Sequence, residues 1–212
     1  AVAVVAAVGV VGWRVFSQKD TNDVVQTATD LPKGSQVANN TQNTCDKTPE
    51  IPLPVDKLQI ESILYPGQDR GGNYKPHGGF RLKGGNEASI TLPADAKLIA
   101  GARYIEQGEV QYMFDFETDC KIRYRFDHLL TLSETLQKEA DKLPEPKPDD
   151  SRTTNVHGPD LSAGTVLATA VGFRQTQNVG FDFGMYDYKQ KNKVSQDASW
   201  LADPQHQFDM AQ

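Results

Sequence analysis

The feature that most constrains this chain is an alternation of apolar and polar residues, which dominates the sequence after Pro54. Because successive side chains of a β-strand point to opposite faces, such alternation predicts strands with one buried face. Two strands are expected near Val166–Phe173 and Val179–Tyr186. Five further segments alternate well: Leu58–Leu64, Ala88–Leu92, Lys97–Ile105, Glu109–Glu117 and Cys120–Phe126. We therefore expect a mainly β domain.

Short turn sequences join two of these strands to their neighbours. Gln107-Gly108 and Thr118-Asp119 supply turns, so the segment VQYMFDFETDCKIRYRF predicts a β-hairpin in an antiparallel sheet. Aromatic side chains in this hairpin are placed for cross-strand packing. We interpret them as core and sheet-face residues rather than as a carbohydrate platform: Tyr112, Phe114, Phe116, Tyr124 and Phe126.

One helix is expected in the middle of the chain, near Leu132–Lys142. Thr131 and Glu134 have the spacing of a capping box, and Leu132, Leu136 and Leu143 give a partly apolar stripe. The proline-rich sequence PEPKPDDSRTTN that follows ends the helix and predicts a surface loop.

Composition divides the chain into four parts. Residues 1–16 predict a hydrophobic anchor helix, residues 17–54 a polar linker, residues 55–190 the β domain, and residues 191–212 a polar tail. A bilayer span needs about 20 residues, so the apolar run is a short, incomplete anchor. The missing initiator Met indicates a chain that begins after a cut or lacks its upstream part.

Charge limits the classes of partner. The net charge of −6 lacks the excess of Lys and Arg that a phosphate-tracking surface needs, so nucleic acid is not an expected partner. The cysteines, Cys45 and Cys120, are too far apart for a CxxC motif. We expect a disulfide that pins the end of the linker to the middle of a predicted strand, contributing roughly 3 to 4 kcal/mol; two unrelated thiols are the alternative.

Histidines limit the metal chemistry that is possible. A zinc hydrolase needs three protein ligands and an open position for water. The chain has His77, His128, His157 and His206, without an HExxH motif and without two histidines close in sequence. His157 and His206 lie in predicted loops and are expected to be solvated.

Five ordered segments nevertheless suggest a family. They are PHGGFR (76–81), LPADAKLIAG (92–101), YRFDHL (124–129), VHGPDLSAGTVLATAVG (156–172) and VGFDFGMYD (179–187). Their order and spacing resemble the lysostaphin/LytM-type zinc endopeptidases, which cut peptidoglycan. The resemblance covers about two thirds of the chain and implies an antiparallel sheet or half-barrel, into which the central helix and its proline-rich loop are inserted.

The resemblance also implies a site, and this sequence departs from it. His77 falls on the first zinc ligand of the family, but Arg81 falls where the ligand Asp should be. His128 falls on a histidine that assists the reaction without binding metal. Gly180 and Asp182 fall on the two histidines of the family's HxH strand, the first catalytic and the second a zinc ligand.

Two of three ligands have therefore changed, and Arg81 is cationic at any relevant pH. The site is degenerate, with His77 and Asp182 as vestigial ligands and no zinc or other cofactor expected. An Arg81–Asp182 ion pair in the former metal position is one hypothesis. Ordinary structural roles are the other, with His77 capping a Pro-His-Gly-Gly turn and His128 hydrogen-bonded at the end of a strand.

Three functions follow from these expectations. The first is a non-catalytic, membrane-tethered, extracytoplasmic binding or scaffold protein of the cell envelope, with peptidoglycan or envelope proteins as partners. The second is a type IV pilin-like filament subunit, because an apolar N-terminal helix and a β-rich head share that layout. The third is a zinc-dependent peptidoglycan endopeptidase with a rebuilt site.

Overall fold

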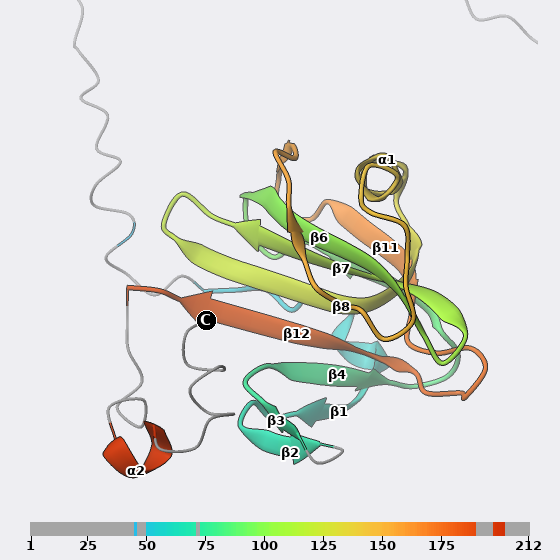
Figure 1. Ribbon diagram of the computed structural model, residues 1–212, viewed down its shortest axis with the longest axis horizontal. Helices are drawn as coiled ribbons and strands as arrows, with labels where there is room; N and C mark the ends of the chain where they lie inside the picture. The colour runs from blue at the N-terminus through green and yellow to red at the C-terminus, as the bar shows by residue number, and fades with distance from the viewer. Residues whose placement is uncertain (1–44, 46–49, 71–72, 190–196, 202–212) are drawn as a thin grey trace, which may run out of the picture. The chain divides into compact units, whose positions relative to one another are not determined.

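The computed structural model describes residues 45, 50–70, 73–189 and 197–201. The expected anchor helix over residues 1–16, most of the linker and His206 lie outside these residues. Within them the chain is mainly β, as expected, and the strands form an open antiparallel sheet (Figure 1). No helix of the described part is long and apolar enough to cross a membrane.

The main sheet runs in the order β1-β4-β12-β8-β7-β6-β10, and β11 leaves this path to pair with both β5 and β8. A separate hairpin of β2 and β3 flanks it, and β9 pairs with β6. The strand bounds are β1 Ile60–Leu64, β2 Gln68–Arg70, β3 Asn73–Lys75, β4 Gly78–Leu82, β5 Glu87–Thr91, β6 Ala96–Glu106, β7 Glu109–Glu117, β8 Ile122–Leu132, β9 Thr154–Asn155, β10 Asp160–Leu161, β11 Val166–Val171 and β12 Gly180–Asp187.

The alternation of the sequence becomes an alternation of faces. Along β8, Ile122, Tyr124 and Phe126 are buried in the main core, and the charged residues between them lie on the opposite face. Phe181 of β12 also belongs to this core. The expected core aromatics belong to the core or pack against it, as predicted.

The helices are short. Helix α1 spans Glu134–Ala140 and packs against β6, β8 and β11, burying Leu136 and Ala140. Its N-cap is Ser133, whose hydroxyl accepts the Leu136 N–H at 3.4 Å. The capping role expected of Thr131 is wrong because β8 continues through Leu132. A 3₁₀ turn, η2 (Lys57–Gln59), precedes β1, and α2 spans Ala198–Leu201.

The disulfide is present, but at a different place in the hairpin. Cys45 and Cys120 are bonded, and Cys120 lies in the turn between β7 and β8, because β8 begins only at Ile122. The expectation that the bond reaches the middle of a strand is therefore wrong. A structural disulfide persists in an oxidising compartment, which indicates an extracytoplasmic environment for this chain.

Candidate functional site

A β-bulge in β8 creates the site. Tyr112 pairs with Leu129 and Phe114 with Phe126, so Asp127 and His128 together face the single residue between the two β7 partners. His128 has φ +62°, a left-handed conformation that costs a non-glycine residue about 1–2 kcal/mol. Backbone strain of this kind is concentrated at functional sites. The bulge places two titratable side chains side by side on the polar face of the sheet.

A carboxylate on the neighbouring strand joins two imidazoles. Nε2 of His77 donates a hydrogen bond to Oδ2 of Asp182 at 2.8 Å, and Nε2 of His128 lies 3.9 Å from the same oxygen. His77 precedes β4, and Asp182 pairs with Gly79 across the β4–β12 ladder. A Cβ atom at Gly79 would lie 2.9 Å from Oδ1 of Asp182 and 2.7 Å from the Phe181 carbonyl oxygen, so only glycine leaves room for this carboxylate.

A second network holds the other side of His128. The Tyr104 hydroxyl donates a hydrogen bond to Oδ1 of Asp127 at 2.5 Å and lies 3.4 Å from Nδ1 of His128. The same carboxylate oxygen accepts the His128 backbone N–H at 2.7 Å. Oε2 of Glu106 lies 3.9 Å from Nδ1 of His128. The six side chains of His77, Asp182, His128, Tyr104, Asp127 and Glu106 therefore form one continuous polar group across four strands or strand ends.

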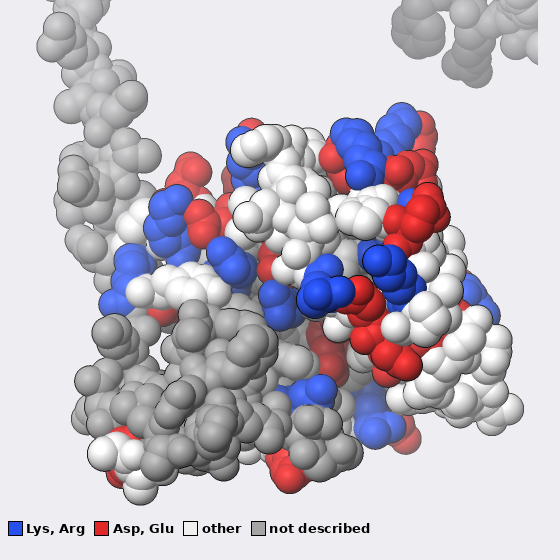
Figure 2. Space-filling model, in the orientation of Figure 1, with Lys and Arg blue, Asp and Glu red and all other residues white. Residues whose placement is uncertain are grey.

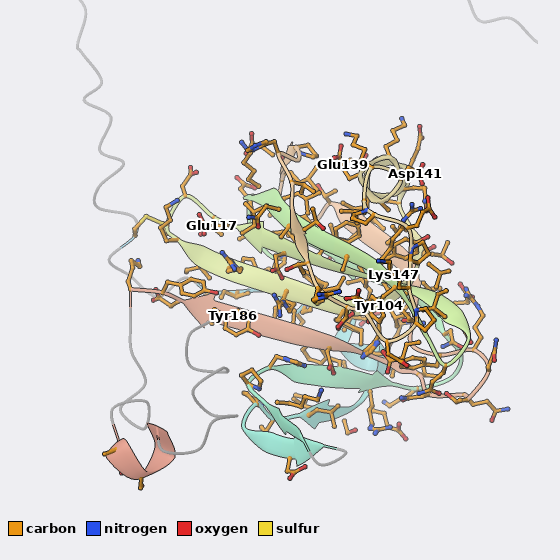
Figure 3. The ribbon with its side chains drawn as sticks, viewed as in Figure 1. Tyr104, Glu117, Glu139, Asp141, Lys147 and Tyr186 are labelled. Atoms are coloured by element: carbon orange, nitrogen blue, oxygen red, sulfur yellow. A yellow bond between two sulfur atoms is a disulfide. The ribbon has the colours of Figure 1, made fainter. Side chains whose placement is uncertain are left out.

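Burial shifts two acid–base equilibria in this group. Burial and the charge of Asp127 raise the pKa of the Tyr104 phenol far above its ordinary value, so the phenol stays protonated and donates. Burial also raises the pKa of Glu106 above that of an ordinary carboxyl group, while His128 acts in the opposite direction. Figure 3 places Tyr104 and Tyr186 toward opposite ends of β12, so these shifts concern one end of the polar face.

A hollow of about 250 Å³ opens beside the site. His128 and Asp182 line it together with Lys75, Arg81 and Glu106. Among the described residues, neither Lys75 nor Arg81 makes a side-chain hydrogen bond or ion pair, although Lys75 acts on Glu106 through its charge. Figure 2 shows Lys and Arg interspersed with Asp and Glu over the face in view, without a continuous basic stripe there.

The structure brings the expected site residues into one region but arranges them differently from the hypothesis. Arg81 pairs with Gly180, not with Asp182, along the β4–β12 ladder, and its side chain is exposed. Within the described part of the chain, Arg81 forms no ion pair with Asp182, because His77 already binds that carboxylate. The expected Arg81–Asp182 pair is therefore wrong. His157 is exposed, as expected.

Three members of the site were missed by sequence reasoning. Tyr104 and Glu106 lie on β6: Tyr104 falls in the segment Lys97–Ile105, which was predicted only as a strand, and Glu106 directly follows that segment. Asp127 precedes His128 and could have been noticed as an acid beside a histidine. The bulge that turns both side chains toward Tyr104 leaves no visible mark in the alternation.

The donor atoms do not match a catalytic zinc centre as they lie. Two ligands about 2.1 Å from a tetrahedral zinc ion are roughly 3.4 Å apart, whereas His77 Nε2 and Asp182 Oδ2 are 2.8 Å apart and bond to each other. Arg81 lines the same hollow and would repel a dication. Among the described residues, no three His, Cys, Asp or Glu side chains are grouped to hold a metal ion.

Comparisons with family models, with curated proteins and with solved structures give no match to this chain. The function proposed below therefore rests on the chemistry of the site and on the motif resemblance.

Proposed function

We propose that this chain is a non-catalytic binding or scaffold protein of the cell envelope, built on a decayed peptidase-like β domain. Its polar hollow retains the position of a former active site and binds envelope material without cutting it. Peptidoglycan is the partner we propose first, because the motif resemblance is to enzymes that act on it.

The observation that carries this proposal is the bonding of Asp182. Its carboxylate accepts a hydrogen bond from His77 and faces His128, instead of standing free to take a metal ion. The exposed cation Arg81 lines the same hollow. A site of this composition offers donors and charges for recognition, whereas zinc-dependent hydrolysis needs an open metal position and a bound water.

The location of the protein is also part of the proposal. The Cys45–Cys120 disulfide fits an oxidising, extracytoplasmic compartment. We propose that the apolar residues 1–16 tether the domain to a membrane and that the polar linker gives it reach toward the envelope.

Co-sedimentation with purified peptidoglycan sacculi tests this function. The full chain should sediment with sacculi and release no soluble fragments, with or without added zinc. Arg81→Glu should weaken binding because it reverses a charge at the hollow. Lys97→Glu is the matched control: it makes the same charge change at an exposed β6 residue that does not line the hollow, so it should bind like the parent.

Two results would contradict the proposal. Release of soluble fragments by the parent would identify a hydrolase. Absence of binding, or equal binding by the parent and Arg81→Glu, would remove the hollow from any role in peptidoglycan recognition.

A further inference from the structure

In the hollow beside His128, the cations Lys75 and Arg81 form no direct ion pair with the carboxylate of Glu106 within the described part of the chain. Lys75 ends β3, Arg81 lies on β4 and Glu106 ends β6, so three strands contribute them. Glu106 accepts no side-chain hydrogen bond within the described part of the chain, and its nearest charged partner there is His128 at 3.9 Å. Space between the charges thus remains for a ligand.

The surroundings of these charges restrict the size and character of that ligand. The hollow measures about 250 Å³, slightly below the roughly 300–1,000 Å³ of most small-molecule sites. Its lining includes Gln107, Asn178 and Phe173, and the Phe173 ring lies 4.8 Å from the His128 ring. A small, compact molecule with several hydrogen-bonding groups fits these dimensions.

The charges and the buried aromatic ring of the hollow argue against three common ligand classes. A phosphate group would meet the carboxylates of Glu106 and Asp182, and a divalent cation would meet Lys75 and Arg81. A neutral sugar ring stacks on an exposed aromatic face, but Phe173 is only 4% exposed. A ligand that carries one positive and one negative group satisfies both sets of side chains.

We propose that the hollow binds a small zwitterion, namely an amino acid or the free end of a short peptide. Arg81 and Lys75 receive its carboxylate, and Glu106 receives its ammonium group. The guanidinium fork of Arg81 suits a carboxylate, and charge-assisted hydrogen bonds are stronger than neutral ones. This inference rests on the proposed function, since it names the ligand class of the same non-catalytic hollow.

Calorimetric titration of the full chain with the dipeptide alanyl-alanine tests the inference. Two capped forms are the matched ligands: the N-acetyl form lacks the ammonium group, and the C-terminal amide lacks the carboxylate. We expect the uncapped dipeptide to bind roughly tenfold more tightly than either capped form, which corresponds to about 1.4 kcal/mol per lost group.

Each variant should lose affinity only for a dipeptide that carries the charged group which the replaced side chain binds. Glu106→Gln should weaken the uncapped dipeptide roughly tenfold and leave the affinity of the N-acetyl form unchanged. Arg81→Gln should weaken the uncapped dipeptide and spare the amide. Lys97→Gln, an exposed cation outside the hollow, should bind like the parent, and thermal unfolding should show that every variant is folded.

The inference is overturned if the parent does not bind the dipeptide. It is also overturned if a variant loses as much affinity for the capped form that lacks the corresponding charged group as for the uncapped dipeptide. If the protein still sediments with sacculi in either case, the ligand class is wrong and the proposed function stands. If it binds neither sacculi nor dipeptide, both are wrong.

Discussion

The hydroxyl of Tyr104 lies 2.5 Å from Oδ1 of Asp127, and this contact ties β6 to the bulge of β8 across the intervening strand β7. The Tyr104 side chain is only 1% exposed, so the hydrogen bond forms away from bulk water. The same carboxylate holds the backbone N–H of His128, whose φ is positive. Tyr104 therefore supports the strained residue at the centre of the site.

Replacing Tyr104 with Phe should destabilise the protein by about 1.5–3 kcal/mol, the usual worth of a hydrogen bond to a charged group. The reason is that the Asp127 carboxylate stays partly buried but loses its shortest hydrogen bond. Urea unfolding of the full chain measures the effect. Tyr65→Phe is the control, since Tyr65 is 67% exposed; an equal effect of the two substitutions would deny Tyr104 this role.

Two similar Arg–Asp pairs allow burial to be tested separately from bonding. Arg125 binds Asp115 through two hydrogen bonds of 2.7 and 2.8 Å, and Arg152 binds Asp150 through two of 2.7 Å. The Arg125 and Asp115 side chains are 19% and 1% exposed, whereas the Arg152 and Asp150 side chains are 87% and 24% exposed.

Asp115→Ala should cost about 3–5 kcal/mol of unfolding free energy, because it leaves a largely buried guanidinium without its partner. Asp150→Ala should have no effect beyond the error of the same urea experiment, because the guanidinium of its partner Arg152 is largely in solvent and is hydrated without the carboxylate. Similar losses of unfolding free energy in the two variants would show that the hydrogen bonds, rather than burial, determine how much each ion pair stabilises the fold.

The raised pKa of Glu106 makes a prediction about pH. A carboxyl group whose folded-state pKa is raised stabilises the fold fully below its unfolded pKa, about 4.3, and that contribution is lost as pH rises through the folded value. Glu106→Gln should therefore match the parent below about pH 4 and be more stable at neutral pH. The gain should be less than about 1 kcal/mol, because the side chain is 35% exposed and screened by solvent.

Urea unfolding at a series of pH values checks this sign. Glu61→Gln, on the exposed edge strand β1, is the comparison and should not reproduce the trend. If the parent is more stable than Glu106→Gln at neutral pH, burial is not the dominant influence on the pKa of Glu106.

Restoring the ligand set of the resembling family should create a zinc site. In the double variant Arg81→Asp with Asp182→His, a carboxylate replaces the Arg81 cation, which would repel a zinc dication by about 8 kcal/mol at 4 Å and an effective dielectric of 20. Metal analysis after dialysis against zinc should find about one ion per double variant and none in the parent. The single variant Asp182→His, which keeps Arg81, should bind more weakly than the double variant. Stoichiometric zinc in the parent at these residues would revive the hydrolase hypothesis.

The strands that could be predicted are those whose side chains alternate without interruption. Strand β7 spans Glu109–Glu117, as the alternation predicts, and the Gln107-Gly108 turn joins it to β6. Strand β4 is not among the predicted strands, and its first two residues, Gly78 and Gly79, belong to the Pro-His-Gly-Gly segment described above as a turn. Those glycines mark close packing instead, since a Cβ at Gly78 would lie 2.5 Å from the Leu64 carbonyl oxygen.

Only the individual residues of the site could be predicted from the sequence, and not the contacts between them. His77, His128 and Asp182 were singled out one by one in the sequence, and the fold brings them together. Arg81 lies opposite Gly180 and diagonal to Asp182 across the β4–β12 ladder, so the lack of an ion pair between them depends on the His77–Asp182 hydrogen bond. Register and bulges follow from pairing across the sheet, which a single sequence does not display.

The bond between Cys45 and Cys120 also determines how the domain responds to mechanical load. A pull on the chain ahead of Cys45 passes directly to the β7–β8 turn, because the bond bypasses the chain between two residues that are 75 positions apart. Strands β1 to β7 lie within that bypassed segment and are spared tension while the bond is intact. Reduction would move the load to the exposed edge strand β1, so the same pull would peel the sheet from its edge.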